Sequence, residues 1–169
     1  MGNFDEAVRA LDAFLPYVDN WVTCDYISPT VFPKHPEKLL EKIDEWLSSN
    51  EAFTVRFAIG MLMKHFLDDR FEERFLSIVA SVAHEGWDSE SERRAISADG
   101  ANTYDNAYYV NMMRAWYFAT ALAKQPDAAL PFIEQKRLDP WTRNKAIQKA
   151  IESRRIGPEL KSHLRTLQR

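Results

Sequence analysis

Apolar residues recur every three or four positions along most of this chain, which is the spacing of an amphipathic helix. Over residues 4–15 they alternate with acidic residues as far as Pro16, and over residues 37–47 they form one stripe that follows Pro36. Proline ends a helix in the first case and suits the first turn of a helix in the second. The pattern predicts two helices, each with one buried face.

Two later segments, residues 51–67 and 108–123, are apolar on nearly all sides. A helix without a polar face is buried between other helices. Further helical segments follow at residues 71–83, at 126 to about 136, at 140–153 and at 158–167. The chain is therefore predicted to be a series of helix pairs.

These pairs open alike, because each first helix begins with an aromatic residue: Phe53, Tyr109 and Trp141. This alignment makes three residues equivalent: Arg56, Met112 and Lys145. Repeating helix pairs of this size indicate an α-solenoid of the HEAT kind, and no segment has a competing strand pattern. We expect an all-α fold, an α-α superhelix, with residues 1–169 in a single HEAT-like helical repeat domain.

One polar stretch interrupts the series of helices. Residues 86–106 are rich in Ser, Asp and Glu and poor in aliphatic side chains. Such a composition is typical of a loop at the surface. We predict a long surface loop here, with a short helix around residues 91–96.

Composition places the chain among soluble globular proteins, with 46% apolar and 28% charged residues in a length of 169. The single cysteine, Cys24, excludes an internal disulfide and fits a reducing cytosol. No apolar run reaches the roughly 18–20 residues needed to cross a bilayer, and no signal-peptide pattern opens the chain. A cytoplasmic protein that does not enter a membrane is the expectation.

The charge of the chain is unevenly distributed. The net charge is −3, but residues 136–169 hold ten Lys or Arg against three acidic residues, which leaves the rest of the chain strongly acidic. A basic end on an acidic body suggests a partner with a phosphate backbone that touches one face only. A solvated basic terminal helix is the alternative explanation.

Motifs for metal, nucleotide or nucleophile chemistry are missing from the sequence. The four histidines are scattered without HExxH spacing, and no GxGxxG, P-loop or GxSxG pattern is present. We therefore expect no metal and no cofactor. Cys24 has no cationic neighbour in sequence, so a small buried residue is a better interpretation than a nucleophile.

A tryptophan and a carboxylate, Trp21 and Asp25, lie four residues apart just before a break at Ser28 and Pro29. On a helix capped by Asp19 or Asn20, this spacing puts both side chains on one face. A flat aromatic surface beside an anion can hold an electron-poor sugar or base. For the tryptophan, packing in the core is the alternative.

Four stretches, in this order along the chain, match a known family: Trp21-Val22-Thr23-Cys24-Asp25, Arg56-Phe57-Ala58-Ile59, Tyr108-Tyr109-Val110 followed by Ala115-Trp116, and Asn144-Lys145-Ala146. With them the chain resembles the DNA alkylation repair proteins of the AlkD type, which are HEAT-like DNA glycosylases acting on alkylated purines. The resemblance implies that Asp25 is the catalytic carboxylate. It also implies that Trp21 and Trp116 line the site beside the lesion-bearing deoxyribose, and that Arg56 meets the DNA backbone.

This implied chemistry is coherent. A purine alkylated at N3 or N7 is a cationic leaving group, so its departure requires no general acid. What remains is to stabilise the oxocarbenium-like sugar and to align water. One carboxylate and two indole faces can do this by electrostatic and cation–π attraction.

Four basic residues are the candidate contacts to double-stranded DNA, through a concave basic face: Arg56, Arg143, Lys145 and Lys149. Arg56 lies on an otherwise apolar helix, where its charge must reach solvent, a ligand or a partner, and a salt bridge to Asp25 is an alternative. The other three share one amphipathic helix, and phosphate contacts from them would weaken steeply with salt.

A second hypothesis is a catalytically silent HEAT scaffold that binds nucleic acid or protein. Family members usually have further helices before the Trp-x-x-x-Asp segment, whereas few residues precede it here. We expect either a truncated product or a short relative with less DNA surface. The 86–106 loop is also longer than the family resemblance leads us to expect at that point, and its acidic residues could obstruct the concave face.

Overall fold

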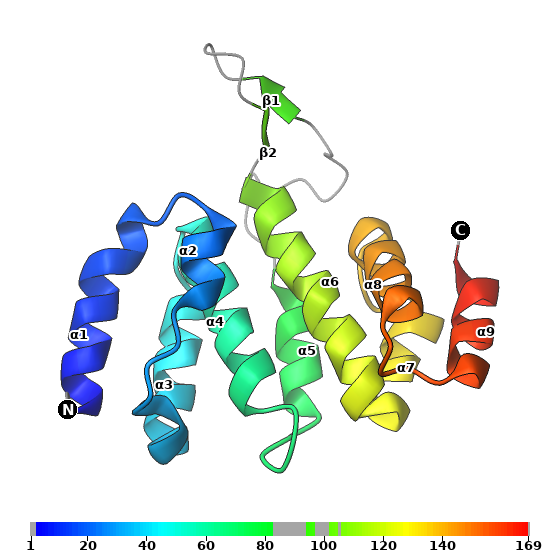
Figure 1. Cartoon of the computed structure of the whole chain (residues 1–169), viewed down its shortest axis with the longest axis horizontal. Coiled ribbons are helices and arrows are strands. Elements are labelled where there is room, and N and C mark those ends of the chain that lie inside the picture. Colours follow the sequence, from blue (N-terminus) through cyan, green and yellow to red (C-terminus); the bar gives the residue numbers. More distant parts are fainter. Residues whose placement is uncertain (1–2, 83–93, 97–101, 105, 169) are drawn as a thin grey trace.

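A computed structural model of the chain describes residues 3–82, 94–96, 102–104 and 106–168. Its helices stand side by side in a row from the N-terminus to the C-terminus (Figure 1). The predicted all-α, solenoid-like class is confirmed. In the part of the chain that the structure describes, no helix is both long and apolar enough to span a membrane.

The N-terminal third contains three α-helices and two 3-10 turns: α1 Phe4–Phe14, a 3-10 turn Leu15–Tyr17, α2 Trp21–Tyr26, a second 3-10 turn Phe32–Lys34, and α3 Pro36–Leu47. Asn3 and Glu6 close the start of α1 in a reciprocal capping box. Helix α1 is tied to α3, because the Trp46 indole N–H donates to Asp12 at 2.8 Å and Lys42 pairs with the same carboxylate at 2.8 Å.

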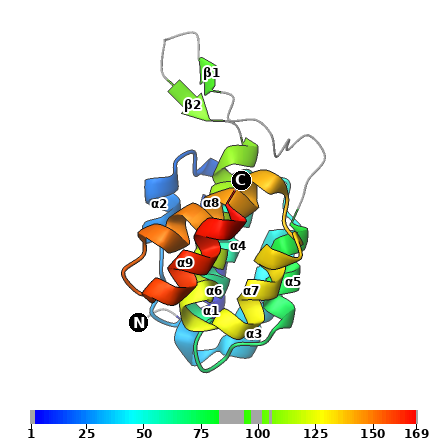
Figure 2. The same cartoon turned by 90° about the vertical axis from the view of Figure 1, so that its right-hand side faces the viewer.

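Three helices form the central row: α4 Ala52–His65, α6 Asn106–Lys124 and α8 Pro140–Glu152. Helix α6 packs between the other two, and each of the three buries apolar side chains. Helices α5 Arg74–Ser81 and α7 Pro126–Glu134 lie on one side of the row, with α2 on the opposite side (Figure 2). The last helix, α9 Pro158–Leu167, packs on α8. The predicted partners α6 and α7, and α8 and α9, are in contact, whereas α5 packs mainly on α6.

Buried arginines correct the predicted alignment of the pairs. Arg114 donates to the carbonyls of Val79 at 3.0 Å and Ala80 at 2.6 Å, at the end of α5. Arg143 donates in the same way to the Ile133 carbonyl at 2.7 Å, at the end of α7. These two arginines are therefore the equivalent residues. Aligning Met112 with Lys145 was wrong by about one helical turn.

Two short strands, β1 Arg94–Ile96 and β2 Asn102–Tyr104, pair antiparallel with Arg94 opposite Tyr104. They lie beyond the start of α6 (Figure 1). The short helix expected around residues 91–96 is wrong for 94–96, and its other residues lie outside the described part. Thr and Tyr favour a strand once a partner strand exists. A strand of three residues is too short for an alternating pattern to be recognised in the sequence.

Candidate functional site

The short helix α2 presents the tryptophan–carboxylate pair. Its N-cap is Asn20, whose side chain accepts a hydrogen bond from the Thr23 amide at 2.9 Å, as one of the two predicted caps. Trp21 is 52% exposed, whereas the side chain of Asp25 is 12% exposed. The carboxylate thus faces the body of the protein, and much of the indole faces solvent.

Asp25 is held by Arg56 of α4 through two hydrogen bonds. Arg56 Nε donates to Oδ1 at 2.9 Å and Nη2 donates to Oδ2 at 2.6 Å. The third arm, Nη1, donates to the Tyr109 carbonyl of α6 at 2.8 Å. A bidentate arginine fixes the plane of a carboxylate as well as its position. One guanidinium therefore joins α2, α4 and α6 at this carboxylate.

This arrangement differs from the direct phosphate contact expected of Arg56. Its side chain is only 4% exposed, and each of its three nitrogens donates to a protein oxygen. The salt bridge to Asp25, considered as the alternative, is what the structure contains. The reason is physical, because a charged group on a buried helix requires a nearby counter-charge.

A second cation of α4 also reaches α2. Lys64 Nζ donates to the main-chain carbonyl of Asp25 at 2.7 Å and lies 3.5 Å from the carbonyl of Ile27. Burial lowers the pKa of Lys64, and the nearby Asp25 charge partly opposes that change. Side chain and main chain of Asp25 are therefore both bonded to α4.

Cys24 is a buried residue, as predicted, and its thiol donates to the Phe53 carbonyl at 3.3 Å. Burial, helped by the Asp25 charge, raises the pKa of this thiol to about 12. A thiol with so high a pKa is not a nucleophile near neutral pH.

Trp116 of α6 connects two neighbouring hollows in the protein. A narrow one of about 30 Å³ is lined by Asp25, Arg56, Gly60 and Lys64 and reaches Trp116. A wider groove of about 480 Å³ lies between α6 and the end of α8 and is also lined by Trp116. The indole is 41% exposed. The structure therefore brings Asp25 and Trp116 to one place.

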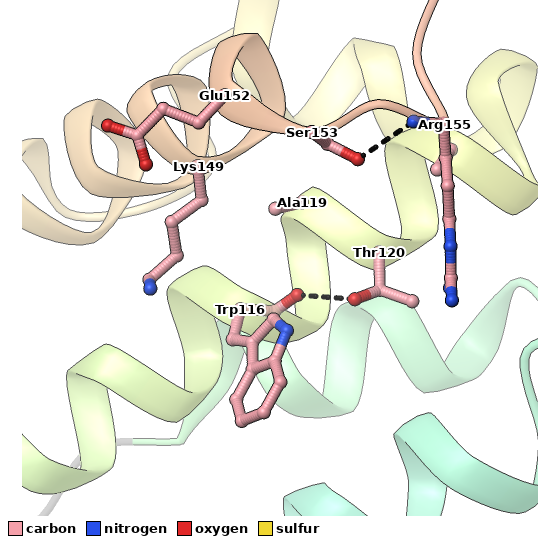
Figure 3. A pocket seen from close by; sticks show the side chains of 8 residues that line it. Trp116, Ala119, Thr120, Lys149, Glu152, Ser153 and Arg155 are labelled. Carbon is pink, nitrogen blue, oxygen red and sulfur yellow. Dashed lines mark hydrogen bonds between the residues drawn. The ribbon is translucent and has the colours of Figure 1, made fainter.

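Figure 3 shows the wider groove, with Lys149 and Arg155 reaching from the α8 side toward Trp116 and Thr120. Glu152 points away from the indole. Among the described residues, neither Lys149 nor Arg155 has a carboxylate within salt-bridge distance. Burial lowers the pKa of Lys149, with Glu152 acting in the opposite direction. The groove thus holds two cations beside an aromatic face.

The remaining predicted cations of α8 divide into two kinds. Lys145 is partly exposed, and its Nζ lies 5.6 Å from the centre of the Trp141 ring. Arg143 is only 5% exposed and its Nε donates to the Ile133 carbonyl at 2.7 Å, so the phosphate contact predicted for it would require the side chain to leave this buried position. It lies on the face of α8 that packs against the protein, opposite to the solvated one.

Sequence reasoning missed Lys64 and Arg155. A signal for the first exists, because Arg56, Gly60 and Lys64 recur every four residues and so share a face of α4. Arg155 follows the end of α8, and no periodic pattern covers the turn that aims it at the groove. The position of Arg155 at the groove depends on the conformation of the turn between α8 and α9.

The residues that the structure describes contain no group of three or more His, Cys, Asp or Glu that could hold a metal ion. A family model described as DNA alkylation repair enzyme matches residues 2–150 of the chain. No curated protein and no solved structure matches it.

Proposed function

This chain belongs to the DNA alkylation repair enzyme family, and on that premise we propose that it excises alkylated purines from double-stranded DNA. The reaction is hydrolysis of the N-glycosidic bond at purines alkylated on N3 or N7. The observation that carries the proposal is the position of Trp116, which borders both the Asp25 hollow and the groove with two cations. Lesion and backbone would be held at adjoining places of one HEAT-like scaffold.

Asp25 is the charge-stabilising group in this proposal. The alkylated purine leaves with its positive charge neutralised, and positive charge develops on the deoxyribose. A carboxylate already fixed in orientation stabilises that charge without having to reorganise during the reaction. Arg56 acts on the reaction through Asp25, as a positioning residue. Trp21 and Trp116 supply indole faces toward the cationic sugar.

Lys149 and Arg155 are the proposed backbone contacts, and Lys145 is a further one at the α8 surface. An exposed cation near a groove can pair with a phosphodiester, and each such contact makes binding weaker as salt rises. In this proposal Arg143 supports the protein core beneath these contacts.

The test is release of 7-methylguanine and 3-methyladenine from methylated duplex DNA by the purified protein. We expect release by the unaltered protein and loss of release by Asp25→Asn, with DNA affinity kept or raised. Failure of the folded, unaltered protein to release either base would overturn the proposal.

Binding of DNA without catalysis is the second candidate, and one observation favours it. Both oxygens of Asp25 already accept hydrogen bonds from Arg56, so the carboxylate charge is partly compensated before any substrate arrives. If the protein binds duplex DNA with a clear salt dependence, and neither the unaltered protein nor Asp25→Asn releases a base, this second function is correct.

A further inference from the structure

Helix α2 is too short to hold its own C-terminus firmly. It has six residues, its last turn contains no basic residue, and the chain becomes extended at Ile27. The last carbonyls of a helix have no partner within the helix and require donors from elsewhere. Asp25 lies in this unsupported last turn, so its position depends on what the neighbouring helix provides.

Helix α4 provides two donors on one face. Arg56 bonds the carboxylate of Asp25, and Lys64, two turns later, bonds the main-chain carbonyl of the same residue at 2.7 Å. Gly60 lies between them and lines the same narrow hollow. A cation at a helix C-terminus is also favoured by the helix dipole. Asp25 is thus attached to α4 at both its side chain and its backbone.

We propose that Lys64 is a positioning residue for base excision, which clamps the C-terminal carbonyls of α2 and so keeps the Asp25 carboxylate aimed at the site. The inference rests on the proposed function of Asp25. Lys64 acts through Asp25 and makes no covalent or proton-transfer step of its own. A phosphate contact from Lys64 is the competing role, because the residue is exposed.

The experiment compares Lys64→Met, which removes the donor, with Lys64→Arg, which keeps one. Single-turnover base release is measured on methylated duplex DNA, together with DNA affinity at several salt concentrations. Lys34→Met, at an exposed lysine away from the site, is the matched control. We expect the Met variant to lose about 100-fold in rate, which is the size of effect that a small misplacement produces. We expect the Arg variant to recover most of that rate.

A double variant separates positioning from a general loss of stability. If Lys64 works through Asp25, adding Lys64→Met to Asp25→Asn lowers the residual rate no further. An equal 100-fold loss in both backgrounds would overturn the proposal. An unchanged single-turnover rate, with a salt slope of binding reduced by about one, would also overturn it and would assign Lys64 to a phosphate.

Hydrogen exchange on the free protein tests the clamp without any activity. We expect amides of residues 23–27 to exchange faster in Lys64→Met than in the unaltered protein, while those of α6 stay unchanged. If exchange is unchanged there, the clamp does not exist. If exchange rises but the unaltered protein releases no base, the failure belongs to the proposed function and removes the catalytic role of Lys64 with it.

Discussion

Two buried arginine–aspartate pairs, Arg56–Asp25 and Arg114–Asp139, have similar chemistry and different surroundings. Each arginine is at most 6% exposed in its side chain, and each carboxylate lies within 2.7 Å of its arginine. Arg114 also donates to backbone carbonyls at the end of α5, and burial lowers its pKa against the opposing charge of Asp139. Burial and pairing alone therefore do not distinguish a functional carboxylate.

The difference lies in what else each carboxylate touches. Asp139 is the N-cap of α8. Its second carboxylate oxygen, the one not paired with Arg114, accepts a hydrogen bond from the Thr142 amide at 2.9 Å and so stabilises the start of this helix. Asp25 lines a hollow that continues to Trp116. The Asp139 pair is a structural joint between helices, whereas the Asp25 carboxylate borders a small hollow of about 30 Å³, although its side chain is less exposed (12%) than that of Asp139 (19%).

The largest expected effect is on stability, from Arg114→Met. The change leaves Asp139 without its cation and the α5 carbonyls without a donor, and breaking a buried pair costs about 3–5 kcal/mol. We expect the free energy of unfolding to fall by that amount in urea titrations. Arg9→Met, on an exposed side chain of α1, should change it by less than about 0.5 kcal/mol. Equal losses would mean that Arg114 is not a core joint.

Asp25→Asn and Asp139→Asn compare the two carboxylates directly. Both variants weaken a buried pair, so both should lose stability. Only the first should lose base release, by on the order of 10²–10³-fold per folded molecule, which corresponds to about 3–4 kcal/mol. Release is measured at a temperature where both variants are folded by circular dichroism. Comparable loss of release in Asp139→Asn would remove the distinction between the two pairs.

A smaller effect is expected from Lys149→Gln and Arg155→Gln on DNA binding. Each change removes one cation from the groove beside Trp116. The slope of log affinity against log salt should become shallower by about 0.9 for each phosphate that the variant no longer neutralises. Fluorescence anisotropy with a labelled duplex measures this slope. Arg137→Gln, whose guanidinium stacks 3.9 Å from the Phe132 ring outside the groove, should leave the slope unchanged.

The sequence predicted the helices well, because they depend on periodicity within one segment. It also placed Trp21 and Asp25 on one short helix, where the indole is largely exposed and the carboxylate is turned toward the protein. The Asn20 cap and the buried Cys24 are local in the same sense. The orientation of cations was harder to predict. Arg143 and Lys145 lie two residues apart on one helix, and only the packing of α8 against its neighbours decides which one is buried. The Arg56 bond to the Tyr109 carbonyl joins residues 53 apart in sequence, which no local pattern predicts.

The smallest expected effect is on the pH dependence of stability, and it comes from His65 at the end of α4, next to Lys64. Burial, followed by the charges of Lys64 and Arg70, lowers the pKa of His65 below its ordinary 6.5, and its Nε2 is buried without a hydrogen-bond partner among the described residues. The unfolded chain then binds this proton more tightly than the folded protein. Stability should therefore fall as the pH drops through 6.5 and recover fully above it.

His65→Gln removes this titration, so it should flatten that part of the pH dependence. Urea unfolding at pH 7.5 and pH 5.5 measures the difference for each protein. His163, an exposed histidine 2.7 Å from Glu134, serves as the control site through His163→Gln. If only the His65 variant loses the difference in unfolding free energy between pH 7.5 and pH 5.5, the loss of stability in acid comes from the end of α4. An unchanged pH dependence of stability in His65→Gln would show that the proton binds elsewhere.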